Sequence, residues 1–134
     1  MVKFLKAGRV VIVLQGRMAG KKAVIVQNSD TGNKERPYGH CVVAGIEQTP
    51  KKVTRRMSKK KIARRTKLKP FIKVVNHRHL MPTRYNIDLG AEFKGKISIT
   101  DPTKRTASKR NVKKVFQQRY LAAKNKWFFQ KLRF

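Results

Sequence analysis

Acidic residues are scarce in this sequence. Only 6 of its 134 residues are Asp or Glu, against 35 Lys or Arg, which gives a formal net charge of +29 and a sequence pI of about 11.5. A charge of this size destabilises a free globule by self-repulsion. We therefore expect an anionic partner in the working state, with nucleic acid as the first candidate and an anionic membrane surface as the second.

Cysteine and long apolar runs are also scarce. The one cysteine, Cys41, excludes an internal disulfide and is typical of a cytosolic or nuclear protein. No window reaches the roughly 18 apolar residues that a membrane-spanning helix needs. The apolar run of residues 10–14 is shorter than the ~7–15 residues of a signal-peptide core. We therefore expect neither a membrane span nor a secretory signal.

Groupings typical of active sites and metal sites are missing too. No Ser/His/Asp or Cys/His set has a spacing that suits nucleophilic catalysis. Asp88 and Glu92 are four residues apart, but the glycine between them indicates a turn rather than a catalytic pair. His77 and His79, together with His40–Cys41, form a weak zinc pattern because no CxxC accompanies them. The sequence predicts no enzyme, no metal site, no cofactor and no small-molecule substrate.

The positive charge is concentrated in two blocks. Residues 50–70 contain 11 cations and no acid, and residues 101–134 contain 11 cations and one acid. A basic run is usually just a solvated surface, but a block this dense in so basic a chain favours polyanion binding. The stretch RRMSKKKIARR also resembles a nuclear-localisation signal.

The first basic block is not expected to fold alone. It contains the like-charge pairs Lys60/Arg64 and Lys61/Arg65, which oppose helix formation at this i,i+4 spacing. We expect this segment to be poorly ordered in the free protein and to become ordered against phosphates.

Short apolar runs predict a small β-barrel. Residues 10–14 and 23–26 are rich in β-branched side chains, a turn cluster follows at 29–33, and residues 39–48 and 71–75 supply two further strands. Short strands linked by polar turns are typical of a barrel. The first strand is apolar on both faces, so it needs a second layer to cover its outer face.

A short basic loop joins the first two predicted strands. Gly16 and Gly20 are interpreted as turn glycines with positive φ, because the loop lacks the Gly-Lys-Ser/Thr ending of a P-loop. Arg17, Lys21 and Lys22 are then held on a rigid turn, where they can contact phosphates at little cost in entropy.

The C-terminal segment predicts a basic amphipathic helix over residues 104–127. Asp101 is its expected N-cap, and Pro102 suits its first turn. Apolar side chains recur every three or four residues, so they form one stripe that we expect to cover the barrel. The stripe consists of Val112, Val115, Phe116, Tyr120, Ala123 and Trp127. The aromatic residues Trp127–Phe129 and Phe134 exceed what one stripe needs and could contact the barrel, a partner protein or an unstacked base.

The segment from residue 8 to residue 26 has an apolar strand, a glycine, a basic loop and a second apolar strand. It resembles a KOW motif within an SH3-like barrel, with Gly16 as the motif glycine and Ala23 where many members have a second glycine. The N-terminal MVKF, the segments SDTGNKERPYGHCVVAGIE and LMPTRYN and the ending KNKWFFQKLRF extend the similarity along the whole chain. Together they resemble the eukaryotic-type large-subunit ribosomal protein family twenty-seven.

This resemblance implies a structural, non-catalytic protein of the cytosolic large ribosomal subunit, with nuclear and nucleolar passage during assembly. Its implied partners are ribosomal RNA and neighbouring ribosomal proteins, without a membrane. The expected fold class is mainly β with α: an SH3-like KOW barrel over 1–80, interrupted by the basic insertion 50–70. A connecting segment at 81–101 and a basic helix with an aromatic tail at 102–134 complete the expected domains.

The expected RNA-binding residues are the cations of the loop, the insertion and the helix, with two isolated arginines. They are Arg17, Lys21, Lys22, Lys51, Lys52, Arg55, Arg56, Lys59, Lys60, Lys61, Arg64, Arg65, Lys67, Lys69, Arg78, Arg84, Lys104, Arg105, Lys109, Arg110, Lys113 and Lys114. Phosphate contacts should dominate, since A-form grooves offer side chains little access to base edges. The alternatives are a free KOW-type factor in transcription or chromatin and a membrane-surface protein.

Overall fold

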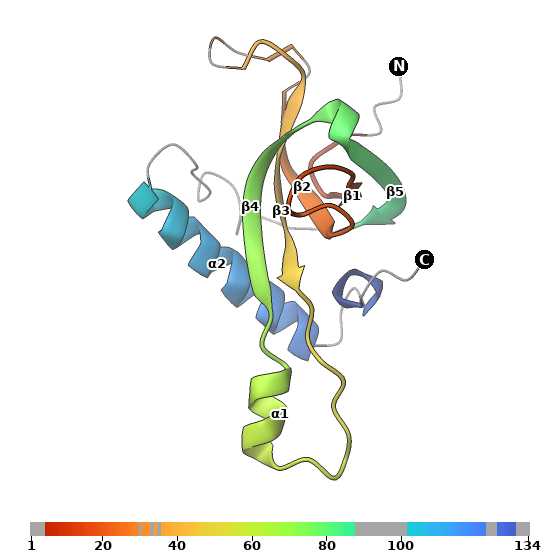
Figure 1. Cartoon of the computed structure of the whole chain (residues 1–134), viewed down its shortest axis with the longest axis vertical. Helices are drawn as coiled ribbons and strands as arrows, with labels where there is room; N and C mark the ends of the chain where they lie inside the picture. Colours follow the sequence, from red (N-terminus) through yellow and green to blue (C-terminus); the bar gives the residue numbers. More distant parts are fainter. Residues whose placement is uncertain are drawn as a thin grey trace.

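A single antiparallel sheet of five strands forms the centre of the structure, a computed structural model (Figure 1). It describes residues 5–29, 31–32, 34, 36–87, 102–122 and 126–130. The sheet order is β4-β3-β2-β1-β5. The strands are β1 (Arg9–Val13), β2 (Lys22–Ser29), β3 (His40–Gln48), β4 (Lys69–Asn76) and β5 (Leu80–Asn86). The helices are α1 (Lys59–Arg65), η1 (His77–His79), α2 (Pro102–Leu121) and η3 (Lys126–Phe129). The four strands expected from the apolar runs are confirmed, with slightly different ends.

The two faces of the sheet carry two separate apolar clusters. Val10 and Val11 are adjacent in β1, so their side chains point to opposite faces, and each is almost fully buried. The inner cluster includes Val11, Val13, Met18, Ile25, Val43 and Phe71. The outer cluster includes Val10, Val24, Ile46, Val112, Phe116, Phe128 and Phe129. The expectation that the C-terminal segment covers the outer face is confirmed, and each large side chain buried there stabilises the fold by roughly 1.5–3 kcal/mol.

The sheet curls strongly. Strands β4 and β5 lie at opposite ends of the strand order, yet only the three residues of η1 connect them. In a flat sheet the two edges would be ~19 Å apart, four intervals of about 4.8 Å. A three-residue 3₁₀ turn advances only about 6 Å. The two edge strands therefore approach each other at this end, and irregularities of register in three of the four strand pairs introduce the necessary bends.

The sequence does not predict β5, because Pro82 interrupts its pattern. All of the strand after Leu80 falls in residues 81–101, which were expected only to connect the barrel to the helix. Residues 81–86 instead extend the sheet by pairing with β1. Both edge strands contain a proline, Pro70 in β4 and Pro82 in β5. An edge strand tolerates proline because one side of its backbone has no ladder partner.

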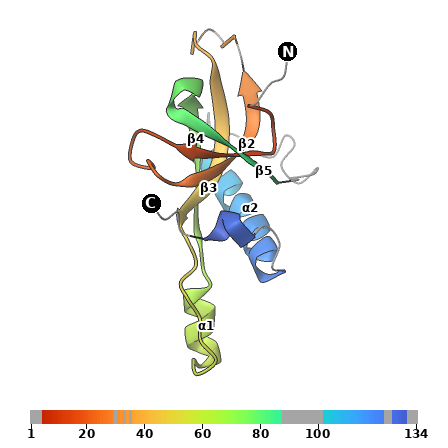
Figure 2. The same cartoon turned by 90° about the vertical axis from the view of Figure 1, so that its right-hand side faces the viewer.

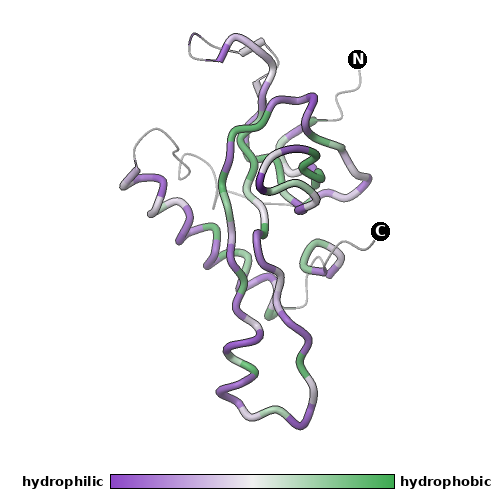
Figure 3. The backbone as a smooth tube through the Cα atoms, viewed as in Figure 1, coloured by the Kyte–Doolittle hydropathy of each residue, from purple (hydrophilic) through white to green (hydrophobic). Residues whose placement is uncertain are grey.

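The first basic block forms a projecting arm, which we define as residues 49–68. It leaves β3, forms α1 and returns to β4, well away from the sheet (Figures 1 and 2). The like-charge pairs oppose a helix here, yet residues 59–65 form one. Ser58 caps α1 by accepting a hydrogen bond from the Lys61 N–H at 3.3 Å, and Arg64 and Arg65 occupy the last turn, where the helix dipole favours cations. No residue of α1 is buried, and Figure 3 shows how hydrophilic the arm is.

The long C-terminal helix ends earlier than the periodicity predicts. It runs from Pro102 to Leu121, and Trp127 belongs to the separate turn η3. Phe116 is fully buried, and its ring meets those of Phe128 and Phe129 edge-on at centroid distances of 5.3 and 6.2 Å. The proposed N-cap Asp101, the pair Asp88/Glu92, Ala123 and Phe134 lie outside the described residues. We call the sheet, α2 and η3 the body of the protein.

Candidate nucleic-acid interface

The loop between β1 and β2 is a tight and anchored turn. Gly16 and Gly20 have φ values of 94° and 81°, which confirms their interpretation as turn glycines. The Gly20 N–H donates to the Val13 carbonyl at 2.7 Å, closing the turn. Met18, at the tip, is 6% exposed and packs into the inner cluster. The loop therefore holds its cations in fixed positions.

The three cations of this loop have different surroundings. Arg17 is exposed, and Lys21 is half-buried beside a hollow of about 430 Å³ that Lys51 also lines. Lys22 is 5% exposed. Arg17 and Lys21 are therefore available to an anion, whereas Lys22 is not.

The expectation that Lys22 contacts phosphate is wrong. Its Nζ donates to the carbonyls of Trp127 at 2.5 Å and Gln130 at 2.8 Å, and lies 3.9 Å from the centroid of the Trp127 ring. Burial lowers the pKa of this ammonium group. Trp127 in turn stacks on Tyr85 of β5, with ring centroids 4.3 Å apart. Lys22 thus fastens the C-terminal turn η3 to the sheet.

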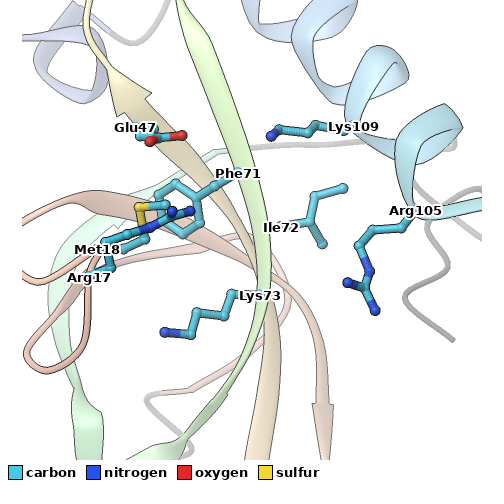
Figure 4. A pocket seen from close by; sticks show the side chains of 8 residues that line it. All are labelled: Arg17, Met18, Glu47, Phe71, Ile72, Lys73, Arg105 and Lys109. Carbon is cyan, nitrogen blue, oxygen red and sulfur yellow. The ribbon is translucent and has the colours of Figure 1, made fainter. Parts of the chain in front are cut away.

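Cations from three elements converge on one hollow, which we call the basic pocket (Figure 4). They are Arg17 from the loop, Lys73 from β4, and Arg105 and Lys109 from α2. The pocket has a volume of about 260 Å³ and an apolar lining of Met18, Phe71 and Ile72, with Glu47 from β3 as its acidic residue. An anion in this pocket would meet cations from three elements at once.

The remaining cations of α2 surround its buried stripe. Arg110 and Lys114 are exposed and lie on the face opposite the buried Val112 and Phe116, as the 3.6-residue period requires. Lys104 and Lys113 are also exposed. The helix therefore presents one face to the protein and its other faces to solvent, as its sequence predicts.

The cations of the arm and of the adjoining strand start are almost all exposed. The exposed members are Lys51, Lys52, Arg55, Arg56, Lys59, Lys60, Lys61, Arg64, Lys67 and Lys69. Arg65 is half-buried, and its Nε donates to the Lys52 carbonyl at 2.7 Å, which ties α1 to the ascending chain. Lys69 lies 3.8 Å from Glu47, a weak ion pair because the lysine is well solvated.

The two isolated arginines lie away from the arm. Arg78 is exposed in η1, at the junction of β4 and β5. Arg84 on β5 donates to the Tyr85 hydroxyl at 3.2 Å, and this hydrogen bond raises the pKa of the guanidinium. The expected RNA-binding residues therefore lie on the arm, the loop, α2, η1 and β5.

His77 and Cys41 share a polar partner within the protein. His77 Nε2 lies 2.7 Å from Asn28 Oδ1, and the Cys41 thiol donates to the same oxygen at 3.4 Å. Among the described residues, no three His, Cys, Asp or Glu side chains are close enough together to hold a metal ion. None of the described helices has the length and apolar content required to cross a membrane.

Known proteins share this sequence along nearly its whole length. Residues 10–134 match the Ribosomal L27e protein family. The chain belongs to the L27e family. It is 56% identical over 137 residues to large ribosomal subunit protein eL27B of Saccharomyces cerevisiae, and 52% identical over 137 residues to eL27 of Candida albicans. It is 53% identical over 136 residues to eL27 of Pyrobotrys stellatus, and each comparison covers all of both chains. The resemblance drawn from the sequence is thereby confirmed.

Two residues of the basic pocket escape sequence reasoning in this L27e chain. In the sequence, Lys73 is part of one predicted strand and Glu47 is near the end of another, so neither is marked as a binding residue. The signal that could have found them is the alternation in β4, which places Phe71 and Lys73 on the same face. Their approach to Arg105 and Lys109 depends on how α2 crosses the sheet, which local sequence does not encode.

Proposed function

We propose that this L27e chain is a structural constituent of the cytosolic large ribosomal subunit, where it binds ribosomal RNA mainly through phosphate contacts and supports subunit assembly and translation. The observation that carries this proposal is its similarity over full length to proteins named large ribosomal subunit protein eL27. The proposal assigns it no catalytic activity. Its partners would be ribosomal RNA and neighbouring ribosomal proteins.

The charge distribution supports phosphate contacts as the main mode of binding. The exposed cations of the arm and α2 far outnumber the acidic residues, of which the whole sequence has six. Each phosphate that such a cation neutralises releases a counterion, which makes association favourable and dependent on salt. The same charge disfavours the free globule and stabilises the assembled particle.

We propose further that the curled sheet is an SH3-like barrel and that β1, the loop and β2 are its KOW motif. The connection through η1 and the positive φ angles of Gly16 and Gly20 support this assignment. The barrel would extend from the N-terminus through β5, interrupted by the basic insertion, with a connecting segment leading to the C-terminal helix and aromatic turn. These parts correspond to one RNA-binding body and two basic extensions.

The proposed location is the cytosolic ribosome, with passage through the nucleus and nucleolus during assembly. The resemblance of the arm sequence RRMSKKKIARR to a nuclear-localisation signal supports this passage.

Sedimentation of the native protein through a high-salt sucrose gradient tests the proposal. We expect the full chain to travel with the large subunit. Recovery as free protein at the top of the gradient would contradict the proposal and favour a free nucleic-acid-binding factor. Flotation with vesicles would contradict it in favour of a membrane-surface protein.

A further inference from the structure

The basic pocket joins parts of the chain that are far apart in sequence. Lys73 lies so close to the loop that a Cβ added to Gly16 would be 2.9 Å from its Nζ. From the other side, α2 contributes Arg105 and Lys109 (Figure 4). Four cations against one carboxylate make the pocket a site for an anion. Three separate elements fix the backbone positions of these cations, so only their exposed side chains remain to be ordered when a ligand binds.

The size of the pocket exceeds what a bare ion requires. Its volume of about 260 Å³ compares with about 30 Å³ for one water molecule in the liquid. Its lining also includes the apolar side chains of Met18, Phe71 and Ile72. Met18 and Phe71 present few atoms to the pocket because they are packed in the inner cluster. A phosphate alone would leave most of the volume unfilled, whereas a ligand with a sugar and a base would fill it.

The pocket contains groups that can accept or donate hydrogen bonds to such a ligand. Glu47 provides a carboxylate, which repels phosphate but accepts from a ribose hydroxyl or a base amino group. The pocket also straddles β4, an edge strand of the sheet. One side of an edge strand presents backbone N–H and C=O groups that have no ladder partner in the sheet.

We propose that the basic pocket binds a single nucleotide that is extruded from a ribosomal RNA helix, an inference that rests on the proposed function. Arg17, Lys73, Arg105 and Lys109 contact the phosphates on its two sides. The sugar and base fill the hollow, and Glu47 accepts a hydrogen bond from one of their donors. Unstacked nucleotides in bulges and loops are the parts of RNA that proteins read by such pockets.

The charge of the pocket favours RNA over a peptide strand. A peptide added to the β4 edge would use its backbone hydrogen bonds but would leave most of the four cations unpaired unless it were strongly acidic. A nucleotide brings an anionic phosphate on each side of its sugar, so it pairs with the cations while its sugar and base fill the hollow.

The test uses two RNA hairpins that differ by one unpaired nucleotide in the stem. Binding of the full chain to each is measured at one salt concentration. We expect the bulged hairpin to bind about tenfold more tightly, because only that hairpin offers an unpaired nucleotide to the pocket. The variant Arg105→Gln/Lys109→Gln should lose most of this preference.

A matched control separates the pocket from general charge. Arg110→Gln/Lys114→Gln removes one arginine and one lysine from the opposite face of α2, so it should weaken both hairpins equally and keep the preference. Glu47→Ala should strengthen binding to the paired hairpin, because a negative charge is removed, yet reduce the preference for the bulge. Thermal melting of each variant verifies that it is folded.

The outcomes distinguish this inference from the proposed function. Equal binding of the parent to both hairpins would overturn the nucleotide pocket while leaving phosphate binding intact. Equal loss of preference in the pocket variant and the control would overturn it as well. Failure of the parent to bind either RNA would overturn both proposals.

Discussion

The body and the arm of this L27e chain carry the same kind of cation but differ in what holds those cations. In the body, the loop is closed by hydrogen bonds and anchored by the buried Met18, and α2 is fixed by the buried Phe116. In the arm, α1 has no buried residue. Burial of apolar side chains is the main source of stability in a fold. The body therefore presents its charge on a preformed surface, whereas the arm is expected to gain most of its order from RNA.

The largest loss of stability in the body is expected from Phe116→Ala, which removes the central side chain of the outer cluster. The loss of buried surface and the resulting cavity should lower the free energy of unfolding by about 3–5 kcal/mol. Thermal or urea unfolding measures this. Leu121→Ala on the same helix is the control, because Leu121 is 68% exposed and should change stability by less than about 0.5 kcal/mol. Equal stability of both variants would mean that α2 does not pack on the sheet.

A smaller effect is expected from Lys22→Met, which keeps the aliphatic part of the side chain and removes the ammonium group. Two carbonyls of the C-terminal turn lose their donor, so stability should fall by about 2 kcal/mol. Urea unfolding and the fluorescence of Trp127, which lies under this ammonium group, both report the change. Lys21→Met is the matched control and should leave both nearly unchanged. If the two variants behaved alike, Lys22 would not fasten η3.

A further, local effect is expected from Ser58→Ala, which removes the cap of α1. The cost is about 1 kcal/mol to the helix, without a change in global unfolding, because α1 does not contribute to either cluster. In the free protein, amides of residues 59–65 should exchange rapidly, and the substitution should make exchange faster still. Strong protection of these amides without RNA would contradict this account of the arm.

The sequence predicts the body better than the arm for physical reasons. Runs of β-branched residues indicate strands such as β1 and β2, and a helical stripe indicates the burial of Phe116, because burial leaves a local pattern. Ser58, by contrast, is a single capping residue that leaves no periodic pattern, and its benefit outweighs like-charge terms of a few tenths of a kcal/mol each. Local pattern therefore does not reveal α1.

The candidate site also combines features that local sequence predicts with features that depend on distant residues. Nothing in the sequence distinguishes Lys21 from Lys22, since the difference arises from carbonyls more than 100 residues further along the chain. The turn glycines of the loop are predictable because positive φ is a local requirement. The basic pocket is not, because it depends on how α2 crosses β4.

The most direct test of the central claim compares salt dependence with stability after the arm has been neutralised. The variant replaces six exposed cations with Gln, namely Arg55, Arg56, Lys59, Lys60, Lys61 and Arg64. Binding to a ribosomal RNA fragment should weaken, and the slope of log K against log[salt] should flatten by up to ~5, at ~0.9 for each duplex phosphate that the arm no longer neutralises. The melting temperature should stay the same or rise slightly. An unchanged slope, or a body that unfolds when the arm is neutralised, would contradict the account.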